Sequence, residues 1–415
     1  MSKQQAVTER KDVLPDNSEP AREKLKKFVS LGEADRPFLI LVIILTALGS
    51  IMMFSASYAF AETNFNDSLY FAKRQIIWIV FGFIIMAVTA HFATPELLRR
   101  LTLVGYVVTI GLNVLVLIMG IATHGAVRQL DLGFVSLQPS ELLKTFNVLL
   151  CARIISFRPA EMKKFRYGVV PFAVLALISA ALCIGQNHLS ATIINILLIF
   201  FMMIIGGTHP AIVGSVGGVG AVAMYYVANN IDSIVEKLKE STLVQSKLSH
   251  VVERLIVWQD PFKYMKYPEL NDPGWQPSQS LYAISAGGVW GLGLGKSVEK
   301  HGYLPEPQND YIFAIICEEL GFAGAVFVIC LFALLIIRGF QIAVKCSGKF
   351  EMMIIMGLVI KVAIQVVLNI AVVTNTIPST GITLPFFSYG GTSLCILMAE
   401  MGIILSLSKT SYIDK

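Results

Sequence analysis

Long stretches with almost no charged residue recur along this chain, and they restrict its fold more than any other feature. A helix needs about 20 mostly apolar residues to cross the ~30 Å hydrocarbon core of a bilayer. Charged residues are only 15% of the sequence, whereas about 25% is usual in soluble domains. Ten stretches qualify, at residues 38–57, 75–92, 101–123, 140–156, 167–185, 188–206, 209–229, 311–337, 351–375 and 383–407. The sequence therefore predicts an all-α, polytopic membrane protein with ten transmembrane helices.

Basic residues collect beside particular spans and predict the orientation of the chain. They precede the first span and follow the second, fourth and eighth, with examples at Arg36, Arg99, Arg153 and Arg338. With both termini in the cytoplasm, all of these clusters fall on the cytoplasmic side, as the positive-inside rule requires. The net charge of +5 therefore reports orientation, and no nucleic-acid partner is expected.

This orientation divides the chain into five parts. The predicted parts are a cytoplasmic tail at 1–37, transmembrane helices 1–7 at 38–229, a large extracytoplasmic loop between helices 7 and 8 at 230–310, helices 8–10 at 311–407, and a cytoplasmic tail at 408–415. We expect the first span to act as an uncleaved anchor. The six cysteines show no paired spacing, so they indicate small buried residues rather than a disulfide framework or a metal site.

The loop at 230–310 begins with an amphipathic pattern. From Ile231 to Ile256, apolar residues recur at steps of three and four, and charged residues occupy most of the other face. With Trp258 at its end, this pattern is typical of a helix in the membrane interface, and equally of a helix packed on the bundle. Further along, Gly287–Gly295 has a glycine every few positions, which allows close approach of another backbone or a ligand.

The loop ends in the segment Gly302–Asp310, where two acidic residues stand at the predicted membrane boundary. Glu306 and Asp310 lie four residues apart, and Pro305 and Pro307 restrict the backbone on either side of Glu306. A carboxylate so close to lipid is costly, which makes it a functional candidate. Asp310 fits two roles: the N-cap of the next helix, worth about 1 kcal/mol, or a general base.

A second polar motif, Gln138–Lys144, opens the fourth span. Ser140 is expected to cap this helix. Glu141 and Lys144 are three residues apart, so they share a helix face and can form an ion pair. Alternatively, Lys144 and Arg128 offer positive charge to an anionic headgroup, because a guanidinium can bind two phosphate oxygens at once.

Polar residues also interrupt the last three spans. Glu318 and Glu319 adjoin, so at least one of them needs a partner, for which Lys361 is the nearest candidate. A polar stripe with a spacing of four then faces the bundle interior in the ninth span: Lys361, Gln365 and Asn369. The stretch 378–393 is rich in proline and glycine and predicts a broken helix, which survives at membrane depth only where protein or a cavity satisfies the freed backbone.

Together these motifs resemble the SEDS family (shape, elongation, division and sporulation) through all ten spans. The most specific stretches are Tyr303–Asp310 with Ile312–Ala314, Glu318–Gly321 and Ser388–Gly391. Two further stretches look more like the division and sporulation branches than the elongation branch: Gln279–Ile284 and Thr383–Phe386. The resemblance implies a peptidoglycan glycosyltransferase that polymerises lipid II at the outer face of the bacterial cytoplasmic membrane.

The resemblance also implies roles for individual residues. The family's essential aspartate falls on Asp310, which would take the proton of the attacking sugar hydroxyl of lipid II. Undecaprenyl pyrophosphate leaves the growing glycan strand, and Arg128, Lys144 or a divalent cation (Mg²⁺ or Mn²⁺) would neutralise its charge. Other motif residues are expected to bind substrate: Gln138, Ser140, Glu141, Glu306, Ser388, Tyr389, Gly390 and Gly391. Membrane lipid and a class B penicillin-binding protein, the transpeptidase that crosslinks the strands, are the expected partners.

Three positions depart from the residues common in the family. Gln129 stands in place of Trp, His188 follows Gln186 and Asn187 where Gln-Pro-Asp is common, and Thr380 stands in place of Lys. These departures leave an inactive scaffold of the cell-wall synthesis complex as an alternative. A bundle with internal polar groups also leaves a lipid II transporter (flippase) as an alternative. The expected process is septal cell-wall synthesis, in division or sporulation.

Overall fold

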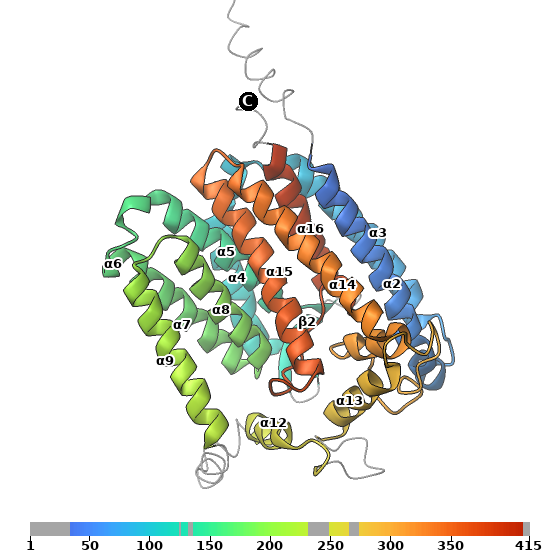
Figure 1. Cartoon of the computed structure of the whole chain (residues 1–415). Helices are drawn as coiled ribbons and strands as arrows, with labels where there is room; N and C mark the ends of the chain where they lie inside the picture. The colour runs from blue at the N-terminus through green and yellow to red at the C-terminus, as the bar shows by residue number, and fades with distance from the viewer. Residues whose placement is uncertain (1–33, 124–125, 132–135, 231–248, 265–273, 410–415) are drawn as a thin grey trace, which may run out of the picture.

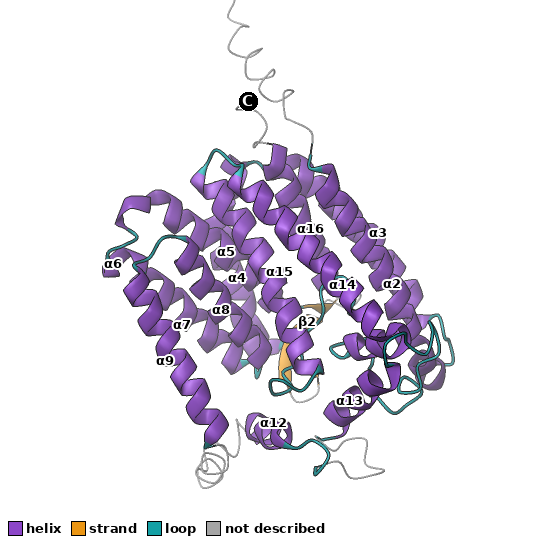
Figure 2. Cartoon of the chain, viewed as in Figure 1, coloured by secondary structure: helices purple, strands orange, loops and turns teal. Residues whose placement is uncertain are grey.

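A computed structural model describes residues 34–123, 126–131, 136–230, 249–264 and 274–409 as a bundle of helices with one small sheet (Figures 1 and 2). The helices are α2 (Arg36–Phe65), α3 (Tyr70–Phe92), α4 (Pro95–Met119), α5 (Pro139–Phe157), α6 (Phe165–Gly168), α7 (Val170–Gly185), α8 (Leu189–Ile205), α9 (Pro210–Asn229), α12 (Ser249–Gln259), α13 (Trp275–Gly287), α14 (Ile312–Val344), α15 (Lys349–Val373) and α16 (Gly391–Ser408), with a 3-10 turn, η1, at Pro159–Glu161. Three antiparallel strands lie between α4 and α5 in the order β1 (Ile121–Thr123), β2 (Ala126–Asp131) and β3 (Ser136–Leu137).

Seven helical segments in the described residues are long and apolar enough to cross a membrane: α2, α3, α4, Phe165–Gly185 (α6 with α7), α14, α15 and α16. The other three predicted spans coincide with α5, α8 and α9. The apolar segments Leu189–Ile205 of α8 and Pro210–Gly220 of α9 are shorter than the seven, and α5 carries Glu141, Lys144 and Arg153. The prediction of a mainly helical, multi-pass membrane protein is therefore confirmed.

Several helices extend at least five residues beyond the predicted spans: α2 to Phe65, α14 to Val344, α3 from Tyr70 and α4 from Pro95. Two further predicted boundaries fall on non-helical backbone. The span predicted at 101–123 ends as a helix at Met119, because the C-cap residue Gly120 has extended backbone angles and leads into β1. The span predicted from 383 begins as a helix only at Gly391. Pro385 has no N–H to donate to a helix, and Phe386 has a φ of 66°, which is outside the helical region. This irregular stretch agrees with the break predicted at 378–393.

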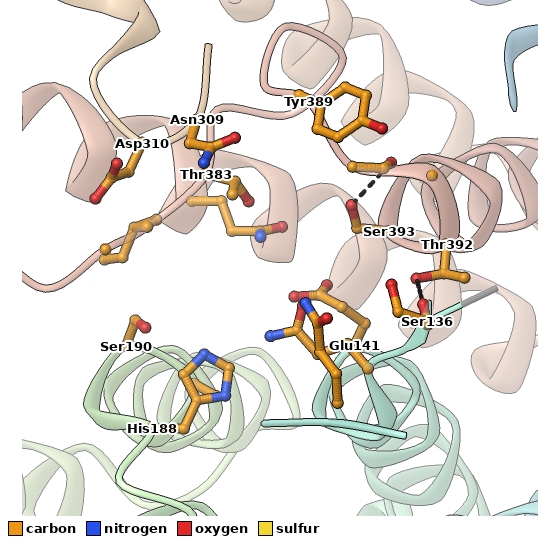
Figure 3. A pocket seen from close by; sticks show the side chains of 18 of the residues that line it. Ser136, Glu141, His188, Ser190, Asn309, Asp310, Thr383, Tyr389, Thr392 and Ser393 are labelled. Carbon is orange, nitrogen blue, oxygen red and sulfur yellow. Dashed lines mark hydrogen bonds between the residues drawn. The ribbon is translucent and has the colours of Figure 1, made fainter. Parts of the chain in front are cut away.

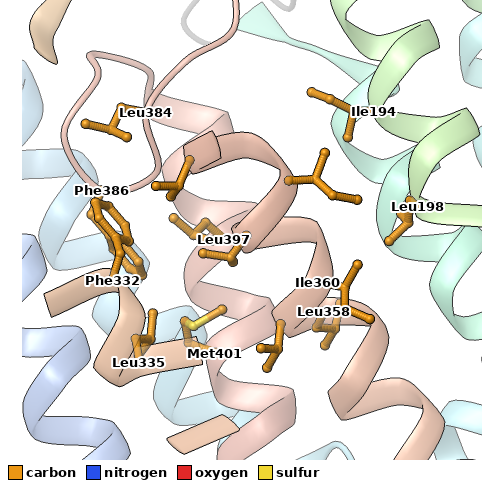
Figure 4. Packing of buried hydrophobic residues seen from close by; sticks show 14 of the residues in the cluster. Ile194, Leu198, Phe332, Leu335, Leu358, Ile360, Leu384, Phe386, Leu397 and Met401 are labelled. Atoms are coloured by element: carbon orange, nitrogen blue, oxygen red, sulfur yellow. The ribbon is translucent and has the colours of Figure 1, made fainter. Parts of the chain in front are cut away.

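The centre of the bundle is α15, which packs against α14, α5 and α8, while α16 packs against α3. Figure 4 shows the apolar core around these helices, with Phe332 and Leu335 of α14 beside Phe386 of the last loop and Leu397 and Met401 of α16. Inside a membrane, helices are held together by van der Waals packing and interhelical hydrogen bonds, because lipid is as apolar as these side chains. The irregular last loop is thus held by apolar packing against α14, where Phe332 contacts Phe386.

Two layers of buried charge stand near opposite ends of α14. At one end, Arg338 donates to both carboxylate oxygens of Asp35, over 3.0 and 2.7 Å. Near the other end, Glu319 accepts hydrogen bonds from the hydroxyl of Ser55 and pairs with the ammonium of Lys300 at 2.5 Å. Each layer therefore joins the N-terminal helix α2 to α14.

The neighbouring carboxylate, Glu318, is satisfied by the loop that precedes α14. It accepts from the backbone N–H of Val298 over 2.7 Å and from the hydroxyl of Ser297. The prediction that Lys361 serves Glu318 or Glu319 is therefore wrong. Lys361 projects from α15 toward α16, where it pairs with Glu400 at 2.6 Å.

Helix α14 is broken at Gly321, which has φ 68° and ψ −172°. The loop after α13 completes the hydrogen bonds that the break removes. The N–H groups of Leu292 and Gly293 donate to the carbonyls of Glu318 and Glu319, and those of Phe322 and Ala323 donate to the carbonyls of Gly288 and Val289. The close backbone approach expected for the glycine-rich run is therefore made with this helix.

The amphipathic pattern at Ile231–Ile256 lies partly outside the described residues, which resume at Ser249 with α12. The indole N–H of Trp258 donates to the carbonyl of Asn375 over 3.0 Å, and Arg254 donates to the carbonyl of Ser379 over 3.1 Å. The described end of the pattern thus contacts the loop between α15 and α16, on the bundle.

We predict that Gly321→Ala destabilises the protein by at least about 1 kcal/mol, because a side chain is strained at this positive φ. The added Cβ would also meet the backbone of Gly291 and Val289. The measurement is thermal unfolding of the purified protein in detergent. The control is Gly111→Ala in α4, where the added Cβ meets no atom within 4 Å. An equal unfolding temperature for Gly321→Ala and the unmodified protein would contradict the role of the break.

We also predict a pH dependence of stability that comes from Glu299, next to the outer charged layer. Burial, and then the charge of Glu318, raise the pKa of Glu299 from 4.5 to about 7. The folded state therefore binds this proton more tightly than the unfolded state, so stability is highest below pH 4.5 and falls as the pH rises through about 7.

Unfolding temperatures measured across this pH range test the prediction. Glu299→Gln should remove the part of the decline that Glu299 causes, whereas Glu96→Gln, at an exposed position of α4, should leave it in place. The same slope in both variants would rule out Glu299 as its origin.

Candidate functional site

A cavity of about 1050 Å³ lies where the segment before α14, the last loop and the ends of α5 and α8 meet (Figure 3). Eight of the eleven residues that were expected to act in catalysis or substrate binding line it: Gln138, Glu141, Lys144, Glu306, Asp310, Tyr389, Gly390 and Gly391. They come from parts of the chain as distant as α5 and α16. Arg128 lies in β2, but its side chain is outside the described part of the structure.

The backbone of the acidic segment is tied to α15 and to the last loop. The side-chain amide of Asn369 donates to the carbonyls of both Asp310 and Ile382, each over 2.7 Å. Ser388 donates to the carbonyl of Asn309 over 2.7 Å, and the N–H of Tyr389 donates to the carbonyl of Gln308 over 2.8 Å. Ser388 thus acts from outside the cavity, on the backbone that carries Asp310.

The carboxylate of Asp310 lines the cavity (Figure 3). The N-cap residue of α14 is Tyr311, whose side chain makes no cap hydrogen bond, so Asp310 stands one residue before the N-cap position that the sequence predicted for it. A Cβ added to Gly381, which has a φ of 69°, would stand 3.6 Å from Oδ2 of Asp310. The absence of a side chain at Gly381 keeps space open beside the carboxylate.

Glu306 occupies a strained position in the same segment. Its φ is 45°, a left-handed conformation that a long side chain rarely adopts and that costs on the order of 1–3 kcal/mol. Its carboxylate accepts from the amide of Asn309 over 2.7 Å. This bond fixes the turn between Glu306 and Asp310, so Glu306 lines the cavity and also shapes the segment.

On the opposite wall, Glu141 and Lys144 form the ion pair that their spacing predicts, at 2.7 Å and almost completely buried. Ser140 does not cap α5: the N-cap residue is Gln138, without a side-chain cap bond. The hydroxyl of Ser140 instead lies 3.2 Å from Nδ1 of His188. One of the departures from the family pattern, His188, is therefore part of the cavity wall.

Beneath this wall a second ion pair extends the polar region into the bundle. Glu400 of α16 accepts from both Lys361 of α15 and Thr145 of α5. Thr145 follows Lys144 directly, so the two ion pairs are coupled through α5. A further cavity of about 30 Å³, lined by Glu141 and Lys361 among others, lies between them.

Two arginines that the sequence analysis does not single out also line the cavity. The Arg74 guanidinium, at the start of α3, lies over the ring of Tyr70 with its Cζ 4.1 Å from the ring centroid. Arg254, on α12, reaches the cavity from the loop at 230–310. The predicted second span starts at residue 75 and so excludes Arg74. Arg254 falls on the polar face of the predicted amphipathic helix, where a charged residue needs no further explanation. Burial raises the pKa of Tyr389, so its phenol stays neutral at physiological pH.

The charges of the cavity suit a substrate with both phosphate and sugar groups. Arginine side chains at Arg74 and Arg254 can bind phosphate oxygens, and the carboxylate of Asp310 can accept a proton from a hydroxyl. Among the described residues, no group of three or more His, Cys, Asp or Glu side chains could hold a metal ion.

We predict that Asn369→Leu loosens the cavity wall, because the carbonyls of Asp310 and Ile382 lose their donor. A buried acceptor left without a partner costs about 1–3 kcal/mol. In hydrogen–deuterium exchange, segments 306–312 and 381–389 should both exchange faster. The control is Asn229→Leu, since the exposed Asn229 amide bonds only a carbonyl of its own helix among its described contacts. Unchanged exchange in either segment would contradict the proposed link.

Comparison with known proteins shows the family to which this chain is related. Residues 35–413 match the family model for the cell cycle proteins FtsW, RodA and SpoVE. The chain is 34% identical over 385 residues to stage V sporulation protein E of Bacillus subtilis, covering 90% of this chain and 98% of that protein. It is 35% identical over 392 residues to a probable peptidoglycan glycosyltransferase FtsW of Trichlorobacter lovleyi, covering 93% and 96%.

Solved structures show the same fold. A chain of a peptidoglycan synthase complex, described as coordinating polymerization and crosslinking, matches with a TM-score of 0.71 at 24% identity, over 92% of this chain and 99% of that one. The rod shape determining protein RodA of Thermus thermophilus matches with a TM-score of 0.63 at 23% identity, over 91% and 98%. The protein therefore belongs to the FtsW, RodA and SpoVE family, as the SEDS motifs indicate.

Proposed function

We propose that this protein is a peptidoglycan glycosyltransferase that polymerises lipid II into glycan strands at the outer face of the bacterial cytoplasmic membrane. The observation that carries the proposal is the placement of Asp310 in a large cavity together with Lys144, Arg74 and Arg254. Relatives that share at least 90% of its length are named probable peptidoglycan glycosyltransferases. Their names and the cavity support the same reaction.

The proposed reaction joins two lipid-linked saccharides. Asp310 accepts the proton of a sugar hydroxyl of lipid II while the hydroxyl oxygen bonds to the anomeric carbon of the growing strand. The bond from that carbon to the pyrophosphate oxygen breaks, and the electron pair leaves with undecaprenyl pyrophosphate. Positive charge for the pyrophosphate comes from Arg74, Arg254, Lys144 and Arg128.

The proposed topology has ten transmembrane helices, formed by the seven candidate spans with α5, α8 and α9. Both termini lie in the cytoplasm, and residues 230–310 form the extracytoplasmic loop between helices 7 and 8. The basic residues that follow α3, α5 and α14 support this orientation. Asp310 then lies on the outer side, where lipid II is polymerised.

The proposed partner is a class B penicillin-binding protein, and the proposed location is the division septum. A structure with the same fold is described as a peptidoglycan synthase that coordinates polymerization with crosslinking. Relatives named FtsW and stage V sporulation protein E support a septal role, in division or sporulation.

One observation favours a second function, transport of the lipid-linked precursor. The Lys361–Glu400 pair is buried deep in the spans, and charged pairs at that depth are common along transport pathways. A polymerisation assay in detergent, where there is no bilayer to cross, separates an enzyme from a transporter.

We predict that Asp310→Asn abolishes polymerisation of fluorescent lipid II by the detergent-purified protein with its transpeptidase. Loss of a general base lowers the rate by about 10²–10⁴-fold. The products are measured as glycan chains on a gel. The control is Asp67→Asn, which removes an exposed carboxylate paired with Lys73 outside the cavity.

Polymer formed at the same rate by Asp310→Asn and the unmodified complex would contradict the assigned base. No polymer from the unmodified, folded complex would favour the transporter or the inactive scaffold.

A further inference from the structure

The two charged layers of α14 mark the limits of the hydrophobic part of the bundle. Between Asp35 and Ser55, α2 advances 20 residues without a break, about 30 Å at the rise of an α-helix. This length equals the thickness of the hydrocarbon core, roughly 30 Å. The Ser55–Lys300–Glu319 layer therefore lies at one membrane boundary.

The loop Gly288–Gly295, here called the interfacial loop, is fixed at the same height. Its backbone hydrogen bonds with α14 flank Gly321, two residues after Glu319. Gly291 has a φ of 78°, and a side chain there would clash with the backbone of Glu319. The loop is thus held directly against the helix and has a defined position relative to the membrane boundary.

The interfacial loop exposes large apolar side chains. Trp290 is 83% exposed, and Val289 and Leu294 are each more than half exposed. A rigid loop that presents a tryptophan and aliphatic side chains to water is unfavourable, and a contiguous exposed apolar surface indicates a contact with a membrane or a partner.

This surface continues onto the lipid-facing side of α14. Phe322, one residue after the break, is 67% exposed, and Phe327 is 55% exposed. Lys296, directly after the interfacial loop, and Tyr303 are also exposed. Tryptophan, tyrosine and lysine are the residues that anchor proteins at the membrane–water interface.

We propose that the interfacial loop lies in the headgroup region of the bilayer, with the indole of Trp290 among phospholipid headgroups. The contact with α14 fixes the loop to the bundle, and the contact with lipid fixes it to the membrane. Because the chain runs from this loop through Lys300 to Asp310, the anchor sets the height of the Asp310 segment above the lipid. The inference goes beyond the proposed activity and depends only on membrane insertion.

The experiment measures tryptophan fluorescence in liposomes that contain this chain alone. The chain has four tryptophans, so the signal of Trp290 is the difference between the unmodified protein and Trp290→Phe. Phosphatidylcholine brominated near the headgroup should quench this difference more strongly than lipid brominated near the chain end. The control is Trp275→Phe, because Trp275 is buried and its difference signal should resist every brominated lipid.

Each other result would overturn the proposal. Quenching by aqueous iodide but by no brominated lipid would place Trp290 in water. Strongest quenching by bromine near the chain end would place it in the hydrocarbon core. Resistance to both quenchers would show that protein, such as a second copy of the chain, covers the loop. None of these outcomes depends on enzymatic activity, so the proposed function is tested separately.

Discussion

A backbone group in the hydrocarbon core of a bilayer has no water to bond, so a break in a membrane helix needs protein groups to satisfy it. Helix α14 breaks at Gly321, and the freed groups are satisfied by the loop after α13 rather than by solvent. The same loop supplies Lys300 to Glu319 and the N–H of Val298 to Glu318. The break therefore joins the outer loop to the bundle, and residues 301–310 leave from a fixed point.

The cavity depends on a second set of backbone bonds, between segments that are distant in sequence. Asn369 holds the carbonyls of Asp310 and Ile382 together, while Ser388 and the N–H of Tyr389 hold the carbonyls of Asn309 and Gln308. The hydroxyl of Ser388 and the N–H of Tyr389, both in the irregular last loop, thus bond the acidic segment. The conformation of the last loop and the position of Asp310 therefore depend on each other.

Hydropathy predicted the helices well, because the cost of placing charge in lipid is read from each stretch alone. The i,i+3 pairing of Glu141 with Lys144 was also local and was predicted. The partner of Lys361 was not, because Glu400 meets it only after α15 and α16 pack. Arg74 and Arg254 were missed for the same reason: nothing near either residue in sequence shows that they share a cavity with Asp310.

The buried Lys361–Glu400 pair needs an explanation other than stability. Desolvating two charges costs several kcal/mol, and their attraction repays this only with good geometry and further hydrogen bonds. Glu400 also accepts from Thr145, which follows Lys144 on α5. An apolar replacement would fill the same space without selecting which faces of α5, α15 and α16 meet. The pair and its hydroxyl partner join α15, α16 and α5 directly beneath the Glu141–Lys144 pair of the cavity wall.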